Sequence, residues 1–222
     1  MTNSVIDVAC SAVLFDCDGV LVDSTRSGEA AWAQWATHFG LDPDTVVAGI
    51  HGVRSGDTVR TYLPASEWAS GLGLIEQLEV ESATSTRMIA GADSLMLEAF
   101  GAFAIVTSAS RRLLRARLAA AGLPTPAVTV TADDVKVGKP HPEPYLRAAH
   151  LLGLPIGECV VVEDSVAGIK AARAARARGV LGIGSASASA GVDHAVADLS
   201  EVAWTGHGLR LSGERLVVPL RA

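Results

Sequence analysis

The stretch SAVLFDCDGVLVDS, residues 11–24, decides the fold. Its apolar run, Ala12–Phe15, ends in two aspartates one residue apart, Asp16 and Asp18, followed by Gly19. An apolar run without polar alternation is typical of a strand that is buried on both faces of a parallel sheet. The two aspartates therefore stand where such a strand ends, which is the edge at which open α/β sheets bind their ligands.

Four more short apolar runs follow this stretch, and helical patterns that end in glycine separate them. The runs are Phe103–Thr107, Ala127–Val130, Cys159–Val162 and Val180–Ile183. One of the helical patterns begins at Ser110, carries Leu114 and Leu118 on one face, and ends before Gly122. The alternation of strands and helices predicts an α/β fold with a doubly wound, Rossmann-like parallel sheet.

Residues 25–90 interrupt this alternation. The apolar residues of the first part follow the i, i+3, i+4, i+7 spacing of a helix face packed into a core: Trp32, Trp35, Ala36 and Phe39. Further helical patterns follow at about 43–49, 55–63 and 66–83, and we find no convincing strand there. We expect a Rossmann-like core of residues 1–24 and 91–222, with residues 25–90 inserted as a helical domain.

Composition limits the class of protein. A length of 222 residues suits one large domain or a core with a smaller insert, and the formal net charge of −6 argues against a surface for nucleic acid or an anionic membrane. The three cysteines lie in or beside apolar runs without metal-binding spacing, as reduced core cysteines do. Because we find neither a signal-peptide pattern nor a membrane-length apolar run, we expect a cytoplasmic protein. The tail after Trp204, with RLSGERLVV, is compatible with a hairpin.

Polar residues follow four of the predicted strands. They are Asp16 and Asp18 after the first, Ser108 after the second, Lys139 after the third, and Glu163 with Asp164 after the fourth. Each of these patterns is common as a helix cap, a turn or a solvated charge. In this order they predict a single site, because the carboxyl ends of parallel strands meet at one edge of the sheet.

The residue types in this predicted site indicate its chemistry. Clustered carboxylates without cysteine or histidine offer hard oxygen ligands, which favour Mg²⁺ as the cofactor. The Ser108 hydroxyl, the backbone N–H of Ala109 and the following helix N-terminus suit a phosphate, and Lys139 adds a positive charge. A carboxylate placed against a phosphoryl group beside a metal and a lysine can act as a nucleophile.

Four motifs, DCDGVLVDS, VTSAS, VKVGKPHPEPY and VVEDSVAGIKAA, occur in this order over nearly the whole chain. Together they resemble the haloacid dehalogenase superfamily of aspartate-nucleophile phosphotransferases. The resemblance implies that Asp16 attacks the phosphate and forms an aspartyl-phosphate. It also implies that Asp18 protonates the leaving alcohol and then activates water, while its backbone carbonyl binds Mg²⁺.

The same resemblance assigns the remaining site residues. Asp164 would complete the metal site with Asp16, and Glu163 would assist directly or through water. Ser108 and Lys139 would hold the phosphoryl oxygens. Gly19 would let the backbone pass close to the phosphate.

The helical insert resembles the small cap domain of this superfamily, which closes over the site and excludes water. Its stretch HGVRSGDTV, residues 51–59, resembles the substrate-reading loop of sugar- and polyol-phosphate phosphatases. His51, Gly52 and Arg54 are therefore candidates for substrate binding. The related β-phosphoglucomutases carry a cap-helix histidine that restrains the aspartic acid until sugar binds, whereas Gly28 stands at the matching position here.

We therefore expect a monomeric, Mg²⁺-dependent phosphatase of small phosphorylated sugars or polyols, because the absent histidine favours attack by water. One alternative is a sugar-phosphate mutase that uses the same machinery. Another is a signalling receiver domain, which also places carboxylates, a hydroxyl and a lysine on a doubly wound sheet. A receiver needs neither the D-x-D spacing nor the helical insert.

Overall fold

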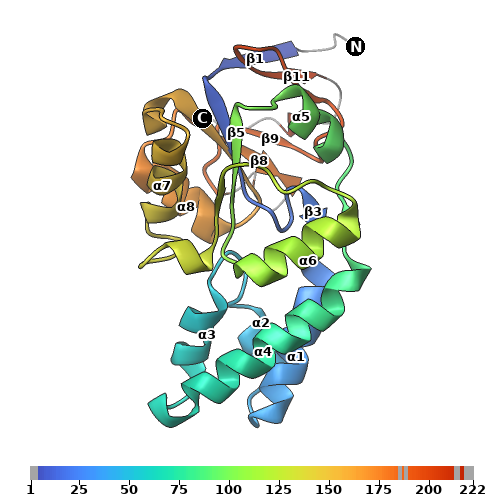
Figure 1. The fold of residues 1–222 in the computed structure, drawn as a ribbon, viewed down its shortest axis with the longest axis vertical. Coiled ribbons are helices and arrows are strands. Elements are labelled where there is room, and N and C mark those ends of the chain that lie inside the picture. The colour runs from blue at the N-terminus through green and yellow to red at the C-terminus, as the bar shows by residue number, and fades with distance from the viewer. Residues whose placement is uncertain (1–4, 185–186, 188–189, 213–215, 218–222) are drawn as a thin grey trace.

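The computed structural model describes residues 5–184, 187, 190–212 and 216–217, and Figure 1 shows the fold. Within these residues the largest sheet has seven strands in the order β12-β9-β8-β7-β2-β5-β6. Neighbouring strands are parallel except at one edge, where β12 runs antiparallel to β9. The strands are β2 (Ala12–Phe15), β5 (Phe103–Val106), β6 (Thr129–Val130), β7 (Cys159–Glu163), β8 (Gly179–Ile183), β9 (His194–Val196) and β12 (Leu216–Val217).

The chain winds this sheet in two directions. From β2 it proceeds to β5 and β6 on one side, and then to β7, β8 and β9 on the other. The order therefore reverses beside β2, and a crevice forms at the carboxyl ends of the strands at such a point. The predicted doubly wound α/β fold is confirmed.

Helices cover both faces of the sheet. Alternate residues of β2 point to opposite faces, so that Val13 and Phe15 join one hydrophobic cluster while Ala12 and Leu14 join another. The first cluster includes side chains of α5 (Ala92–Glu98) and α6 (Arg111–Ala121), and the second those of α7 (Glu143–Leu151) and α8 (Val166–Ala175). Burial on both faces explains why β2 is apolar throughout. Short 3-10 turns, η3 (Ala132–Asp134) and η4 (Ile156–Glu158), precede α7 and β7.

The predicted hairpin in the tail is wrong. Strand β11 (Gly208–Ser212) pairs with β10 (Val202–Trp204) and β1 (Val5–Ala9) in a small antiparallel sheet, whereas β12 joins the large sheet beside β9. Residues 213–215 of the predicted hairpin lie outside the described residues. A strand pattern in the sequence predicts which face of a sheet each side chain occupies, but it does not identify the neighbouring strand. The neighbours of β11 are β1 and β10.

Residues 25–85 form helices that lie together at the bottom of Figure 1. They are α1 (Thr25–His38), α2 (Pro43–Val47), α3 (Ser55–Tyr62), η1 (Ala65–Glu67), α4 (Trp68–Ser82) and η2 (Ala83–Ser85), so the predicted helices are confirmed. Their own hydrophobic cluster includes Trp32 and Trp35, and the Trp35 indole N–H donates to the Gly71 carbonyl at 2.8 Å. We call residues 25–85 the helical segment below.

Two short strands flank the helical segment. β3 (Val22–Asp23) and β4 (Arg87–Met88) pair antiparallel. Because β4 lies between residues 25 and 90, the expectation of no strand in that range is wrong for its two residues. A two-residue strand is too short to show a period in the sequence. The boundaries of the core and of the inserted domain stay a prediction.

Two further observations concern the chain as a whole. The cysteines Cys10, Cys17 and Cys159 are buried and unpaired. Over the described residues, no helix has both the length and the hydropathy that a membrane span requires.

Candidate active site

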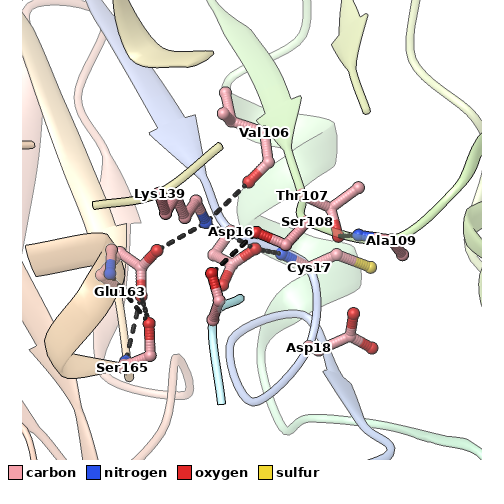
Figure 2. Close-up of polar contacts among 12 residues, drawn as sticks. Asp16, Cys17, Asp18, Val106, Thr107, Ser108, Ala109, Lys139, Glu163 and Ser165 are labelled. Carbon is pink, nitrogen blue, oxygen red and sulfur yellow. Dashed lines mark hydrogen bonds and ion pairs between the residues drawn. The ribbon is translucent and has the colours of Figure 1, made fainter. Parts of the chain in front are cut away.

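Asp16 directly follows β2, and its buried carboxylate lies beside Lys139 (Figure 2). The Lys139 Nζ lies 3.0 Å from Asp16 Oδ1, and it donates to Glu163 Oε1 at 2.6 Å and to the Val106 carbonyl at 3.1 Å. An ammonium group has three protons to donate. These three contacts therefore use the full donor capacity of Lys139 and hold its charge at the strand ends.

Glu163 is fully buried and acts as the anchor of this lysine. Its Oε1 also accepts from the Tyr145 hydroxyl at 2.7 Å, and its Oε2 accepts from the Asp164 N–H, the Ser165 N–H and the Ser165 hydroxyl. Burial opposes ionisation, but the Lys139 ammonium and these donors lower the pKa of Glu163 below its usual value. Because both oxygens already accept hydrogen bonds, the geometry suits Glu163 for orienting Lys139 more than for direct metal binding.

Asp16, Glu163 and Asp164 each bring one carboxylate oxygen into a cluster in which these atoms lie within 4.8 Å of one another. Burial and the neighbouring Glu163 carboxylate raise the pKa of Asp16 well above its usual value, although Lys139 opposes this. The same two causes raise the pKa of Asp164 to about 7. A divalent cation would relieve this repulsion, and a carboxylate set matches Mg²⁺, so the residues present fit the predicted cofactor.

Gly19 lies against the side chain of Asp164. The resemblance had implied instead that this glycine lets the backbone pass close to the phosphate. A Cβ atom at this position would lie 1.9 Å from Asp164 Oδ2, and the backbone φ is +76°. Only glycine adopts this conformation readily and also leaves room for the carboxylate. Gly19 therefore allows Asp164 to approach the loop that follows Asp16.

Ser108 and Ala109 follow β5 and line one cavity together with Asp16, Asp18 and Asp164. The Ser108 hydroxyl donates to the Gly52 carbonyl of the helical segment at 2.8 Å. The Ala109 N–H, a predicted phosphate donor, here donates to the Thr107 hydroxyl at 3.1 Å. The structure thus places both residues at the predicted edge, with their donors engaged by protein groups.

The three candidate substrate-binding residues separate into two groups. His51 and Gly52 line the same cavity as Asp16, and His51 Nε2 lies 3.3 Å from Glu29 Oε1. Arg54 lines a neighbouring cavity instead. Its guanidinium donates to Asp57 at 2.7 and 3.0 Å and to the carbonyls of residues 135–136 at 3.1 and 3.2 Å. Arg54 therefore joins the helical segment to a core loop in this structure.

Asp18 has two side-chain partners, neither of which the sequence analysis identified. Its Oδ1 accepts from the Ser24 hydroxyl at 2.6 Å, and its Oδ2 accepts from Arg117 Nη1 at 2.8 Å. The Nη2 of Arg117 lies 3.3 Å from Glu79 Oε1 on α4. The signal in the sequence is an arginine on the apolar face of α6, beside Leu114. The spacing of residues in the sequence does not connect this arginine with Asp18.

Comparisons with known proteins bear on the identity of this site. A family model described as haloacid dehalogenase-like hydrolase matches residues 10–176. Hexitol phosphatase A of Escherichia coli (strain K12) is 45% identical over 172 residues, which cover 75% of this chain and 80% of that protein. The 2-deoxyglucose-6-phosphate phosphatase 1 of Saccharomyces cerevisiae is 32% identical over 220 residues, which cover 85% of this chain and 88% of that protein.

A solved structure agrees with these matches at the level of the fold. The β-phosphoglucomutase of Clostridium difficile has a TM-score of 0.75 to this chain at 22% identity, covering 86% of this chain and 92% of that one. The family match confirms the predicted resemblance and the prediction of a hydrolytic enzyme, and it sets the receiver-domain alternative aside. With its four motifs gathered at one sheet edge and its family model spanning residues 10–176, the chain belongs to the haloacid dehalogenase-like hydrolases.

Proposed function

We propose that this hydrolase removes the phosphoryl group from small phosphorylated sugars or polyols. The observation that carries the proposal is the buried Asp16 carboxylate, which Lys139 holds at 3.0 Å in a cavity that also contains Asp18, Ser108 and Asp164. The similarity to a hexitol phosphatase and to a 2-deoxyglucose-6-phosphate phosphatase supports the substrate class.

Asp16 is the proposed nucleophile. Among the described residues, the contacts of its carboxylate are made by Oδ1, which accepts from the Cys17 N–H at 2.7 Å and pairs with Lys139 at 3.0 Å. Oδ2 is then available to attack the phosphorus atom. The bond from phosphorus to the substrate oxygen breaks as the new bond to Asp16 forms, which gives an aspartyl-phosphate.

Asp18 is the proposed proton carrier for both halves of the reaction. Its protonated form donates a proton to the oxygen of the leaving alcohol. The resulting carboxylate then takes a proton from water, whose oxygen attacks the phosphorus, releases inorganic phosphate and restores Asp16. Asp18 ends each cycle in the protonation state in which it began.

Asp16, Asp164 and the backbone carbonyl of Asp18 are the proposed holders of Mg²⁺. When bound, the ion supplies positive charge that offsets the carboxylates and the phosphoryl oxygens. Lys139 adds a fixed charge beside Asp16, because Glu163 and the Val106 carbonyl keep its ammonium in place. Ser108 is proposed to donate its hydroxyl hydrogen bond to the phosphate once the substrate is bound.

The helical segment is proposed to act as a cap that selects the substrate. Residues from α1 and α4, together with residues 50–53 and 55, line the cavity that also contains Asp16. His51 and Glu29 offer polar groups for substrate hydroxyls, and Trp32 offers an apolar wall. Closure of such a cap excludes water while the phosphoryl group is transferred.

The test is phosphate release from a panel of hexitol, hexose, pentose and glycerol phosphates, with Mg²⁺ and with a chelator. Asp16→Asn is expected to lower turnover by at least about 10³-fold, because it replaces the attacking oxygen. Asp93→Asn, an exposed position on α5, serves as the matched control and keeps full activity. Substantial activity of Asp16→Asn would refute the nucleophilic role, and isomer formation with a bisphosphate primer in place of phosphate release would assign a mutase instead.

A further inference from the structure

The side chain of Asp18 is held in place by two donors from different parts of the chain. Ser24 holds one oxygen at 2.6 Å, and Arg117 of α6 holds the other at 2.8 Å. The Arg117 side chain is only 6% exposed, whereas the Asp18 side chain is 30% exposed. A partly exposed carboxylate is thus tied to a buried guanidinium, and both residues line the same cavity.

Arg117 also contacts the helical segment. Its Nη2 lies 3.3 Å from Glu79 Oε1 on α4, and the Ser55 hydroxyl donates to the other oxygen of Glu79 at 3.1 Å. The Glu79 side chain is 9% exposed, so the pair is shielded from solvent. Among the described residues, the Nε of Arg117 is buried without a hydrogen-bond partner, so the guanidinium makes its contacts through its two terminal nitrogens. Arg117 therefore connects the loop after β2 with the helical segment.

Gly28 of α1 lies close to the guanidinium of Arg117. A Cβ atom built at Gly28 would have Arg117 Nη2 as its nearest neighbour, at 3.7 Å. The resemblance to the β-phosphoglucomutases implies a histidine at the matching position of those enzymes, whereas glycine leaves this space open here. In this chain the end of Arg117, on the core helix α6, lies beside the open space and contacts Asp18.

We propose that Arg117 is a positioning residue for Asp18, and that its ion pair with Glu79 links the placement of Asp18 to closure of the helical segment. The inference rests on the proposed function, since it assigns Arg117 to the proton transfers of Asp18. Arg117 touches neither the phosphoryl group nor its leaving oxygen in this reaction. It holds the Asp18 carboxylate in place, so that the proton is given to the alcohol and later taken from water at one fixed location.

Loss of Arg117 should affect the formation of the aspartyl-phosphate and its hydrolysis differently when the leaving group needs no proton. With para-nitrophenyl phosphate, the leaving phenolate needs no proton, so the aspartyl-phosphate forms without help from Asp18. Its hydrolysis still needs Asp18 to activate water. An enzyme with a misplaced Asp18 therefore accumulates aspartyl-phosphate.

The experiment is rapid mixing of Arg117→Met and Arg117→Lys with para-nitrophenyl phosphate in the presence of Mg²⁺. We expect Arg117→Met to release a burst of about one nitrophenolate per active site and then to turn over about 10- to 100-fold more slowly than the wild type, with KM changed less than about 3-fold. Arg117→Lys is expected to recover part of the steady-state rate, because one ammonium can hold Asp18 but cannot also reach Glu79 with a second fixed nitrogen. Arg115→Met, an exposed arginine on the same helix, is the matched control and behaves as the wild type.

A double-mutant cycle with Asp18→Asn separates positioning from general structural damage. If Arg117 acts through Asp18, its removal costs little further activity once Asp18 is replaced. Equal loss of the burst and of the steady-state rate, additive effects in the cycle, or a change in KM alone would overturn the inference. Asp16→Asn is assayed in parallel. If this variant still cleaves the substrate, the proposed function itself is wrong. If it is inactive while the Arg117 results contradict the expectation, only the role of Arg117 is wrong.

Discussion

Asp164→Asn is expected to stabilise the folded protein in the absence of divalent metal. Burial and the Glu163 carboxylate raise the pKa of Asp164 from 3.8 to about 7, so an ionised Asp164 is unfavourable in the folded state. Asparagine keeps the shape of the side chain and carries no charge. The substitution removes the repulsion while abolishing one proposed metal ligand.

The pH dependence follows from the direction of this shift. Between pH about 4 and 7, folded Asp164 keeps a proton that the unfolded chain has released, so the free energy of unfolding falls as the pH rises through this window. At about 1.36 kcal/mol per pKa unit, a shift of about three units corresponds to about 4 kcal/mol. Of this free energy of unfolding, the wild type loses about 3 kcal/mol between pH 5 and pH 8. The advantage of Asp164→Asn over the wild type should grow by this amount between these two pH values.

The assay is urea-induced unfolding of both proteins at pH 5 and pH 8 with a chelator, and again with Mg²⁺. Asp93→Asn is the control, because an exposed aspartate on α5 has no comparable burial. Mg²⁺ should narrow the difference at pH 8, since binding to the folded wild type adds about 2.7 kcal/mol at 100 times the Kd, against an advantage of the variant of about 4 kcal/mol. A difference between variant and wild type that is the same at both pH values, or unchanged by Mg²⁺, would refute the argument that Asp164 belongs to a metal-relieved carboxylate cluster.

Two further predictions concern the loops around the site. Gly19→Ala is expected to lower both stability, by more than about 1 kcal/mol, and phosphate release, because its Cβ would meet Asp164 at 1.9 Å. Gly40→Ala, with φ +67° and open space around it, should show the backbone strain alone and keep full turnover; equal losses of activity would contradict the steric argument. His51→Ala is expected to raise KM for polyol phosphates more than Arg54→Ala does, because His51 lines the Asp16 cavity and Arg54 the neighbouring one. Steady-state kinetics of both variants on one substrate decides this, and a larger KM effect at Arg54 would reverse our assignment.

The sheet and the strand-end residues were predictable because they depend on short-range patterns. The run Ala12–Phe15 is apolar throughout since both of its faces are buried, and its bounds match β2. Right-handed alternation of strands and helices then brings the residues after β2, β5 and β7 to one edge without knowledge of any side-chain contact. The positions of Asp16, Ser108 and Asp164 follow from that rule.

The contacts between the helical segment and the core were not predictable in this way. The pairing of Arg117 with Glu79 and Asp18 joins α6 to α4 and to the loop after β2, and no local period encodes such a meeting. Arg54 turns toward the core loop because Gly138 leaves room for it: a Cβ at Gly138 would lie 2.5 Å from Arg54 Nε. Both arrangements depend on how two separately packed parts meet, and a single sequence carries no periodic signal for that.

The hydrogen bond from Ser108 to the Gly52 carbonyl has a consequence for the release of product. A serine hydroxyl has one proton to donate, so a phosphate oxygen that binds Ser108 must displace the carbonyl at 2.8 Å. The net gain from this contact is the difference between a hydrogen bond to a phosphate oxygen and one to a neutral carbonyl, so it is smaller than the full strength of the new bond. Ser108 should therefore contribute less to the affinity for inorganic phosphate than its hydroxyl alone would suggest, since the loop carbonyl competes for the same hydrogen atom.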